Sequence, residues 1–383
     1  MNRSSLGLRI PQGMRDLLPE EMAVQDQLEG EIVSLFKLWA YQKVATPALE
    51  YGACLQPDEE KDDHFYKFFD RQGQVLVVRP ELTTPIARMV SSRLKGSELP
   101  LRLCYSADVF RAESNQNREF RQAGVELIGS DAPLADAEVI ALAIESLRKL
   151  GLKDFQFNLG HMGIFSGIMD ELKIDGQFRL KYQELLAHKD LVGIEGIVER
   201  SEFSDSAKKI LSKIPHFHGQ AEMLEEVLEW SQSPLLQEAV ASLRKVYEYL
   251  KDFNVQEYVA LDLGILRGFS YYTGVIFEGY VRDIGYPIVE GGRYDALYGE
   301  FGYALPATGF AMNLGALAER MSPKTKPCPE VLVYGEDVSQ VIQTVQKLRQ
   351  QGVQAEMSIG NSSPLEAEKL AKRKGIGQVK KVL

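Results

Sequence analysis

The chain has few cysteines and no recognisable set of metal ligands. Its three cysteines, Cys54, Cys104 and Cys328, lie far apart and form no CxxC pair, a pattern that supports neither a disulfide framework nor a zinc knuckle. His216 and His218 have no further ligands at a recognisable spacing, so we expect a surface histidine pair. The sequence therefore predicts no metal site and no bound cofactor.

Positive charge and long apolar runs are also scarce. The chain carries 44 lysines and arginines against 54 aspartates and glutamates, a net charge of −10, which leaves no broad positive field for the phosphates of a nucleic acid. No apolar run approaches the length of a membrane span, and the first residues lack the apolar core of a signal peptide. We expect a cytoplasmic protein without membrane association, for which tRNA is a disfavoured partner.

The 383 residues are enough for two or three domains. Strand and helix patterns over 1–322 predict an α+β domain, interrupted between about 163 and 252 by a helical insertion. A linker with three prolines, 323–329, follows. The order β-α-β-α-β over 330–383 then predicts a small α/β domain.

Polar side chains line a predicted hairpin, residues 103–129. Arg111 and Glu113 share one sheet face by their even spacing, and so do Gln122 and Glu126. Such a face needs partners or a ligand when it is buried, because an unpaired buried charge is strongly destabilising. Two interpretations stay open from this pattern alone: an exposed hairpin with a solvated outer face, or the floor of a binding site.

Three further segments carry polar groups beside predicted strands or helices. The sequence RPELTTP at 79–85 opens a predicted helix, where helix capping explains Glu81 as well as a binding role does. An arginine and tyrosine cluster lies within 266–278, and buried tyrosines and arginines need polar partners. The glycine-rich sequence at 290–295 is, seen alone, only a turn.

Together these segments resemble the motifs of class II aminoacyl-tRNA synthetases in the form found in histidyl-tRNA synthetases. The matching runs are FRAE at 110–113, REFRQ at 118–122, RPELT at 79–83, RGFSYYTG at 267–274 and GGRYD at 291–295. The resemblance covers most of the chain. It implies a class II synthetase-like fold, in which an antiparallel sheet is flanked by helices.

Seven side chains match the residues that hold histidine in that family. They are Glu81, Thr83, Gln122, Glu126, Arg267, Tyr272 and Tyr294. The resemblance implies that Glu81 and Thr83 take the ammonium group of histidine and that Arg267 takes its carboxylate. Arg111 and Glu113 match the side of the site that binds the phosphates of ATP, and we interpret them as a vestige of it.

The departures from the family fall mainly on the ATP and tRNA side. Gly315 and Ala316 stand where the third class II motif has a glutamate and the arginine that grips the γ-phosphate. Hydrogen bonds to charged groups are worth about 1.5–3 kcal/mol each, so we expect activation of an amino acid by ATP to be lost. The loop at 114–118 is short and weakly basic, Ser270 replaces an aspartate, and the tail from 326 is short for an anticodon-binding domain.

A chain with these losses resembles the regulatory subunits of ATP phosphoribosyltransferase, a family of histidyl-tRNA synthetase paralogues. This implies a subunit without catalysis of its own, required for the first step of histidine biosynthesis, with a short-form catalytic subunit as partner and histidine as feedback effector. A match to the first class II motif implies a homodimer, within the hetero-oligomer, through Trp39–Glu50. The alternatives are an active histidyl-tRNA synthetase and a synthetase-like tRNA-sensing module, which the missing arginine and the acidic charge disfavour.

Overall fold

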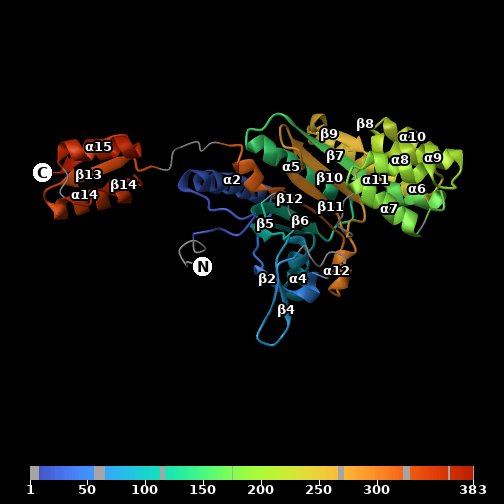
Figure 1. Ribbon diagram of the computed structural model, residues 1–383, viewed down its shortest axis with the longest axis horizontal. Coiled ribbons are helices and arrows are strands. Elements are labelled where there is room, and N and C mark those ends of the chain that lie inside the picture. Colours follow the sequence, from blue (N-terminus) through green and yellow to red (C-terminus); the bar gives the residue numbers. More distant parts are fainter. Residues whose placement is uncertain are drawn as a thin grey trace. The chain divides into compact units, whose positions relative to one another are not determined.

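The computed structural model (Figure 1) describes residues 8–55, 65–112, 117–174, 176–265, 271–321, 328–360 and 363–382. Contacts divide the chain into two compact units. The first is Met1–Asp16 with Gln25–Met321, and the second is Leu17–Val24 with Ser322–Leu383. The predicted boundaries, 1–322, 323–329 and 330–383, stay a prediction.

The first unit is built on a nine-stranded sheet in the order β1-β5-β6-β12-β11-β10-β7-β9-β8. Its strands are β1 (Gln42–Lys43), β5 (Leu101–Phe110), β6 (Glu119–Ile128), β7 (Phe155–His161), β8 (His218–Gly219), β9 (Val259–Asp262), β10 (Val275–Val281), β11 (Val289–Arg293) and β12 (Ala307–Asn313). Neighbours pair antiparallel except β1 with β5 and β7 with β9. The predicted central hairpin is the pair β5 and β6, and β12 lies directly beside it.

Helices pack on this sheet. They are α2 (Pro19–Leu38), α4 (Thr83–Arg93), α5 (Pro133–Lys149), α12 (Leu297–Glu300) and α13 (Leu314–Ala318), and the short α3 (Gly52–Leu55) packs against α4. α2 buries the apolar side chains of Val24, Leu28 and Ile32. Alanine, leucine, isoleucine and valine occupy ten of the 17 positions of α5, and 11 of its residues are buried, as an apolar helix surface requires.

The chain between β7 and β9 is almost entirely helical, as predicted. It forms α6 (Met162–Glu171), α7 (Gly176–Ala187), α8 (Leu191–Glu199), α9 (Asp205–Lys213), the 3-10 turn η2 (Ile214–His216), α10 (Met223–Trp230) and α11 (Pro234–Asp252). α11 packs against both α5 and α6, and Figure 1 shows these helices gathered beyond the β7 side of the sheet. The insertion also contains β8, an edge strand next to β9. The sequence did not predict it, because two residues are too few to show an alternating pattern.

A second, small sheet of the first unit has the order β2-β4-β3. Its strands are β2 (Leu49–Tyr51), β3 (Lys67–Phe69) and β4 (Val75–Val78). β3 pairs antiparallel with β4, so the two strands form a hairpin. Several large apolar side chains of this sheet are exposed, namely Leu49, Tyr51, Phe68, Phe69 and Val75. Such an exposed apolar group is typical of a surface that another chain covers.

The second unit contains a three-stranded parallel sheet in the order β14-β13-β15. Its elements are β13 (Val331–Gly335), α14 (Val338–Gln350), β14 (Ala355–Met357), α15 (Pro364–Lys374) and β15 (Gln378–Val382), which is the predicted order. Alternate residues of β13 enter two separate apolar clusters, one with α14 and one with α15. The two helices therefore cover opposite faces of this sheet.

Candidate functional site

A cavity of about 30 Å³ lies where the β6, β12 and β11 side of the large sheet meets the start of α4. It is lined by Glu81, Thr83, Arg111, Gln122, Tyr271, Tyr272, Glu290, Tyr294, Gly309, Phe310 and Ala311. Strand register brings these distant segments together, since Gln122 of β6 pairs with Asn313 of β12, and Gly291 of β11 pairs with Phe310 of β12. Five of the seven predicted histidine-binding residues line the cavity.

Glu126 lies directly behind the cavity wall. Its carboxyl accepts hydrogen bonds from the Thr83 hydroxyl, at 3.0 Å, and from the Tyr294 hydroxyl, and both donors belong to lining residues. Burial raises the pKa of Glu126 to about 8, and the charge of Glu81 raises it further, while the two hydrogen bonds lower it. The carboxyl of Glu126 therefore carries a proton near neutral pH, and it can then donate a hydrogen bond as well as accept one.

The position of Glu126 depends on a glycine in the neighbouring strand. A Cβ at Gly309 would lie 2.0 Å from Oε2 of Glu126 and 2.4 Å from the carbonyl oxygen of Val125. Any larger residue at 309 would push the carboxyl out of its place. The close approach of β12 to the side chain thus requires glycine there.

Glu81 bonds the start of α4 and also lines the cavity. The backbone N–H of Thr84 donates to both carboxyl oxygens of Glu81, each at 3.1 Å, so the side chain stabilises the start of α4. The same side chain lines the cavity. Burial raises the pKa of Glu81, and the hydrogen bonds from Thr84 and the charge of Arg111 lower it.

Gln122 brings a buried acceptor into the cavity without a partner. The residue is 5% exposed, and its Oε1 atom accepts no hydrogen bond within the part of the chain that the structure describes. An unsatisfied buried polar group costs about 1–3 kcal/mol. A ligand with an N–H group at this point would remove that cost.

Arg111, the only cationic side chain among the described residues of the lining, is held by the main chain. Its Nε donates to the carbonyl oxygen of Pro80 at 3.1 Å, and its guanidinium lies 5.2 Å from the ring centre of Phe120. Arg267 and Glu113, two of the predicted site residues, lie outside the described residues. The predicted roles of all these side chains stay predictions.

The sequence did not predict Tyr271 and Glu290 as part of the site, although both line the cavity. Glu290 begins the EGGRYD run, and a charged residue in the interior of the strand β11, between Val289 and Gly291, was an available signal. Tyr271 stands next to Tyr272 and lies edge-on to it, with ring centres 4.9 Å apart. Two adjacent tyrosines gave no indication of which one faces the site.

The region of the third class II motif keeps its strand and helix, β12 and α13, but is tightly packed. A Cβ at Gly315 would lie 3.3 Å from the Cβ of Phe120, a distance at which the neighbouring strand must shift. The backbone N–H of Ala316 donates to Oδ1 of Asn313, which caps α13. The side chain of Asn117 donates to Glu319 just beyond this helix, at 2.8 Å.

Comparisons with known proteins agree with this geometry. A family model described as histidyl-tRNA synthetase matches residues 13–317. A protein of Desulfitobacterium hafniense named ATP phosphoribosyltransferase regulatory subunit is 62% identical over 379 residues, which is 99% of either chain. The chain belongs to the family of ATP phosphoribosyltransferase regulatory subunits.

Solved structures support the fold of this regulatory subunit family. A structure from Bacillus halodurans, titled as an ATP phosphoribosyltransferase regulatory subunit/histidyl-tRNA synthetase, is 32% identical, has a TM-score of 0.88 and covers 98% of either chain. A histidyl-tRNA synthetase of Nostoc sp. is 20% identical, with a TM-score of 0.83 over 96% of this chain and 90% of its own, and shows the fold alone. The predicted class II synthetase-like α+β fold is confirmed.

The predictions of a regulatory subunit and of no catalysis of its own are confirmed by the names of these relatives. The name of the relative from Desulfitobacterium hafniense does not support the alternative of an active synthetase. In the described part of the chain, no helix is both long and apolar enough to cross a membrane.

Proposed function

We propose that this regulatory subunit binds free histidine in the cavity, and that this binding regulates a catalytic subunit of ATP phosphoribosyltransferase at the first step of histidine biosynthesis. The observation that carries the proposal is the surplus of acceptors at the cavity. Glu81 and Gln122 line it, Glu126 lies behind it, and Oε1 of Gln122 has no donor among the described residues. Such a site favours a ligand that brings several N–H groups.

Histidine supplies donors at both ends. Its ammonium group suits Glu81, Thr83 and Gln122, since a hydrogen bond with an ionised partner is the stronger kind. Its imidazole suits Glu126, because a protonated carboxyl can accept from one ring nitrogen or donate to the other. The resemblance to histidyl-tRNA synthetases supports the same assignment and adds Arg267 for the ligand carboxylate. Tyr272 and Tyr294 complete the proposed set.

The small volume of the cavity supports a change of state on binding. A space of about 30 Å³ holds one or two water molecules, so histidine enters only if lining side chains move. The Thr83 and Tyr294 hydroxyls already bond Glu126, and an imidazole N–H would replace one of them. Histidine thus favours a second arrangement of the cavity, and a difference in affinity between two states is what allosteric regulation requires.

Calorimetry of histidine binding to the full chain tests the proposal. Truncating one partner of a desolvated polar pair costs about 2–5 kcal/mol, so Glu126→Ala and Arg267→Ala should weaken binding by a factor of roughly 30 or more. Gln122→Ala should also weaken it. Gln25→Ala is a matched control, because Gln25 lies on α2 and is equally buried at 5% exposed.

Inhibition of the reconstituted phosphoribosyltransferase by histidine is the second measurement. Each variant that binds histidine more weakly should need proportionally more histidine for inhibition, because coupling is reciprocal between sites. The proposal is wrong if the wild-type chain binds no histidine. It is also wrong if Glu126→Ala abolishes binding while the complex stays fully inhibited by histidine.

A further inference from the structure

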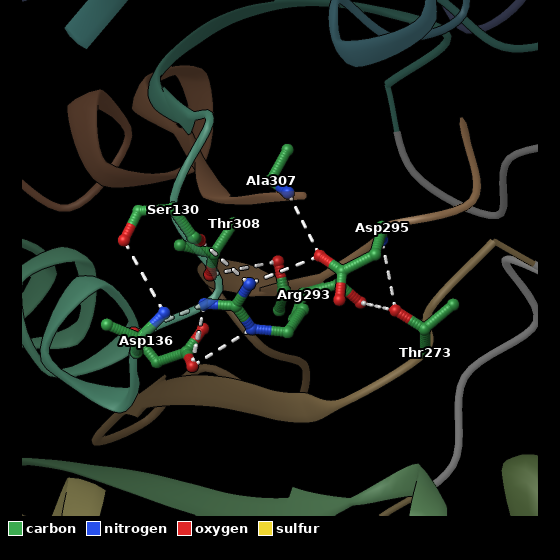
Figure 2. A network of polar contacts seen from close by, with 9 residues as sticks. Ser130, Asp136, Thr273, Arg293, Asp295, Ala307 and Thr308 are labelled. Carbon is green, nitrogen blue, oxygen red and sulfur yellow. Dashed lines mark hydrogen bonds and ion pairs between the residues drawn. The ribbon is translucent and has the colours of Figure 1, made fainter. Parts of the chain in front are cut away.

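A buried arginine network lies beside the cavity without lining it (Figure 2). Arg293, the last residue of β11, is 6% exposed, and Asp136 in the first turn of α5 is 2% exposed. Nε and Nη2 of Arg293 donate to Oδ2 of Asp136 at 3.0 and 2.9 Å. Nη1 donates to the carbonyl oxygen of Ser130 at 3.0 Å and to Oδ1 of Asp295 at 3.1 Å.

The guanidinium therefore joins the start of α5 to the end of β11. Burial raises the pKa of Asp136 to about 6, and the charge of Arg293 opposes this rise. The Asp136 carboxylate thus depends on Arg293 to remain charged inside the protein. Arginine suits this place, since its planar group reaches several acceptors at once and lysine cannot.

The same network fixes the residues on either side of Tyr294. Oδ1 of Asp295 accepts the backbone N–H of Ala307 at 3.0 Å, while the backbone N–H of Tyr294 itself donates to the carbonyl oxygen of Ala307 at 2.8 Å. On the other side, the carbonyl oxygen of Arg293 accepts the backbone N–H of Thr273 at 2.8 Å. Tyr294 is thereby held at its backbone while its hydroxyl bonds Glu126.

The segment that carries the two other tyrosines of the cavity is tied to the same point. The Thr273 hydroxyl accepts the backbone N–H of Asp295 at 3.0 Å, and Thr273 directly follows Tyr271 and Tyr272. Next to it, a Cβ at Gly274 would lie 2.8 Å from Cδ of Arg293, so the arginine side chain packs on the backbone there. The Arg293 side chain therefore touches both tyrosine-bearing walls, at Asp295 next to Tyr294 and at Gly274 next to Thr273, while the bonds of the Tyr294 and Thr273 N–H groups are made by the main chain.

We infer that Arg293 is a positioning residue, which sets the affinity of the cavity for its ligand by holding the backbones of Tyr294 and Thr273 in place. The inference rests on the proposed binding of histidine at this cavity. A binding wall held in its bound geometry loses less freedom when the ligand enters, and affinity rises accordingly. Without the network the walls must be ordered at the moment of binding.

The test uses the full chain with Arg293→Gln, Arg293→Lys and Asp136→Asn. Arg102→Gln is the matched control, because Arg102 makes a two-point contact with Glu138 on the same helix α5, at 2.8 and 2.7 Å, and neither residue lines the cavity. Histidine affinity is measured by calorimetry, thermal stability by the unfolding midpoint, and backbone protection of 271–275 and 293–295 by hydrogen exchange.

We expect Arg293→Gln to weaken histidine binding roughly tenfold or more, Arg293→Lys to restore part of the affinity, and Arg102→Gln to leave it unchanged even where stability falls. In a double-mutant cycle with Tyr294→Phe the two losses should not add, because Arg293 acts through Tyr294. The inference is overturned if Arg293→Gln and Arg102→Gln lose the same stability and both keep the wild-type affinity for histidine. It is also overturned if the affinity losses of Arg293→Gln and Tyr294→Phe add fully. Either result leaves the proposed function standing.

A wild-type chain that binds no histidine would instead refute the proposed function. Hydrogen exchange then tests the positioning role of Arg293 without reference to histidine binding. Faster exchange at 271–275 and 293–295 in Arg293→Gln, with no change in Arg102→Gln, supports the role. Unchanged exchange in both variants refutes it.

Discussion

The buried carboxyl of Glu126 should make the stability of the protein depend on pH in a way that one substitution removes. Its pKa is raised from 4.5 to about 8 in the folded chain. Between these values the folded state keeps a proton that the unfolded state has lost, so stability falls as pH rises. The contribution is fully present below pH 4.5 and is lost as pH passes about 8.

The size of the effect follows from the same shift. One pKa unit corresponds to 1.36 kcal/mol, so a change from 4.5 to about 8 amounts to something on the order of 4–5 kcal/mol. Glu126→Gln keeps the shape and a carbonyl acceptor for Thr83 or Tyr294 but has no proton to lose. The variant should therefore be more stable than the wild type at pH 9, with little difference at pH 5.

Urea unfolding of both proteins at pH values from 5 to 9 measures this difference. A weaker slope should remain in Glu126→Gln, because burial also raises the pKa of Glu81. Glu138→Gln is the control: it removes a carboxylate that contacts Arg102 and Tyr41 and keeps Glu126, so it should retain the wild-type slope. Parallel curves for the wild type and Glu126→Gln would refute the argument that burial keeps this carboxyl protonated.

Two further predictions concern catalysis and assembly. The purified chain should show no histidine-dependent exchange between ATP and pyrophosphate and should not charge tRNA. The reason is that the side chain of Ala316 cannot bind a phosphate. Exchange above about 1 s⁻¹ would contradict this prediction. The chain should form a homodimer at micromolar concentration through Trp39–Glu50 and its surroundings, and Tyr51→Asp, at a side chain that is 57% exposed on β2, should shift it toward monomer in sedimentation. A wild-type monomer would count against the dimer.

Much of the fold could be predicted from local sequence patterns. The central hairpin, the helix that begins at Thr83 and the alternating elements of the second unit all have the predicted order. These elements follow from apolar periodicity and from turn and capping residues, which are local properties. The two-residue strand β8 has no such pattern, and its pairing with β9 comes from tertiary packing.

The site could be predicted only in part. The resemblance of the motifs indicated most of the residues that line the cavity. In the structure these residues meet because β6, β12 and β11 are neighbours in one sheet. The hydrogen bonds that already occupy Glu126 could not be predicted, since they depend on side-chain packing. The contact of Arg293 with Asp136 joins positions 157 residues apart, and no local pattern in the sequence indicates it.

The two sides of the cavity region differ in a way that bears on its present use. On the side that matches the ATP site, a Cβ at Gly315 would lie 3.3 Å from the Cβ of Phe120, and Asn117 is bonded to Glu319. On the other side, Oε1 of Gln122 stays buried without a donor among the described residues. A buried acceptor of this kind destabilises the free protein. A ligand that donates a hydrogen bond to it removes this cost, and the gain adds to the affinity. This favours a cavity that is used for binding over one that is left over from catalysis.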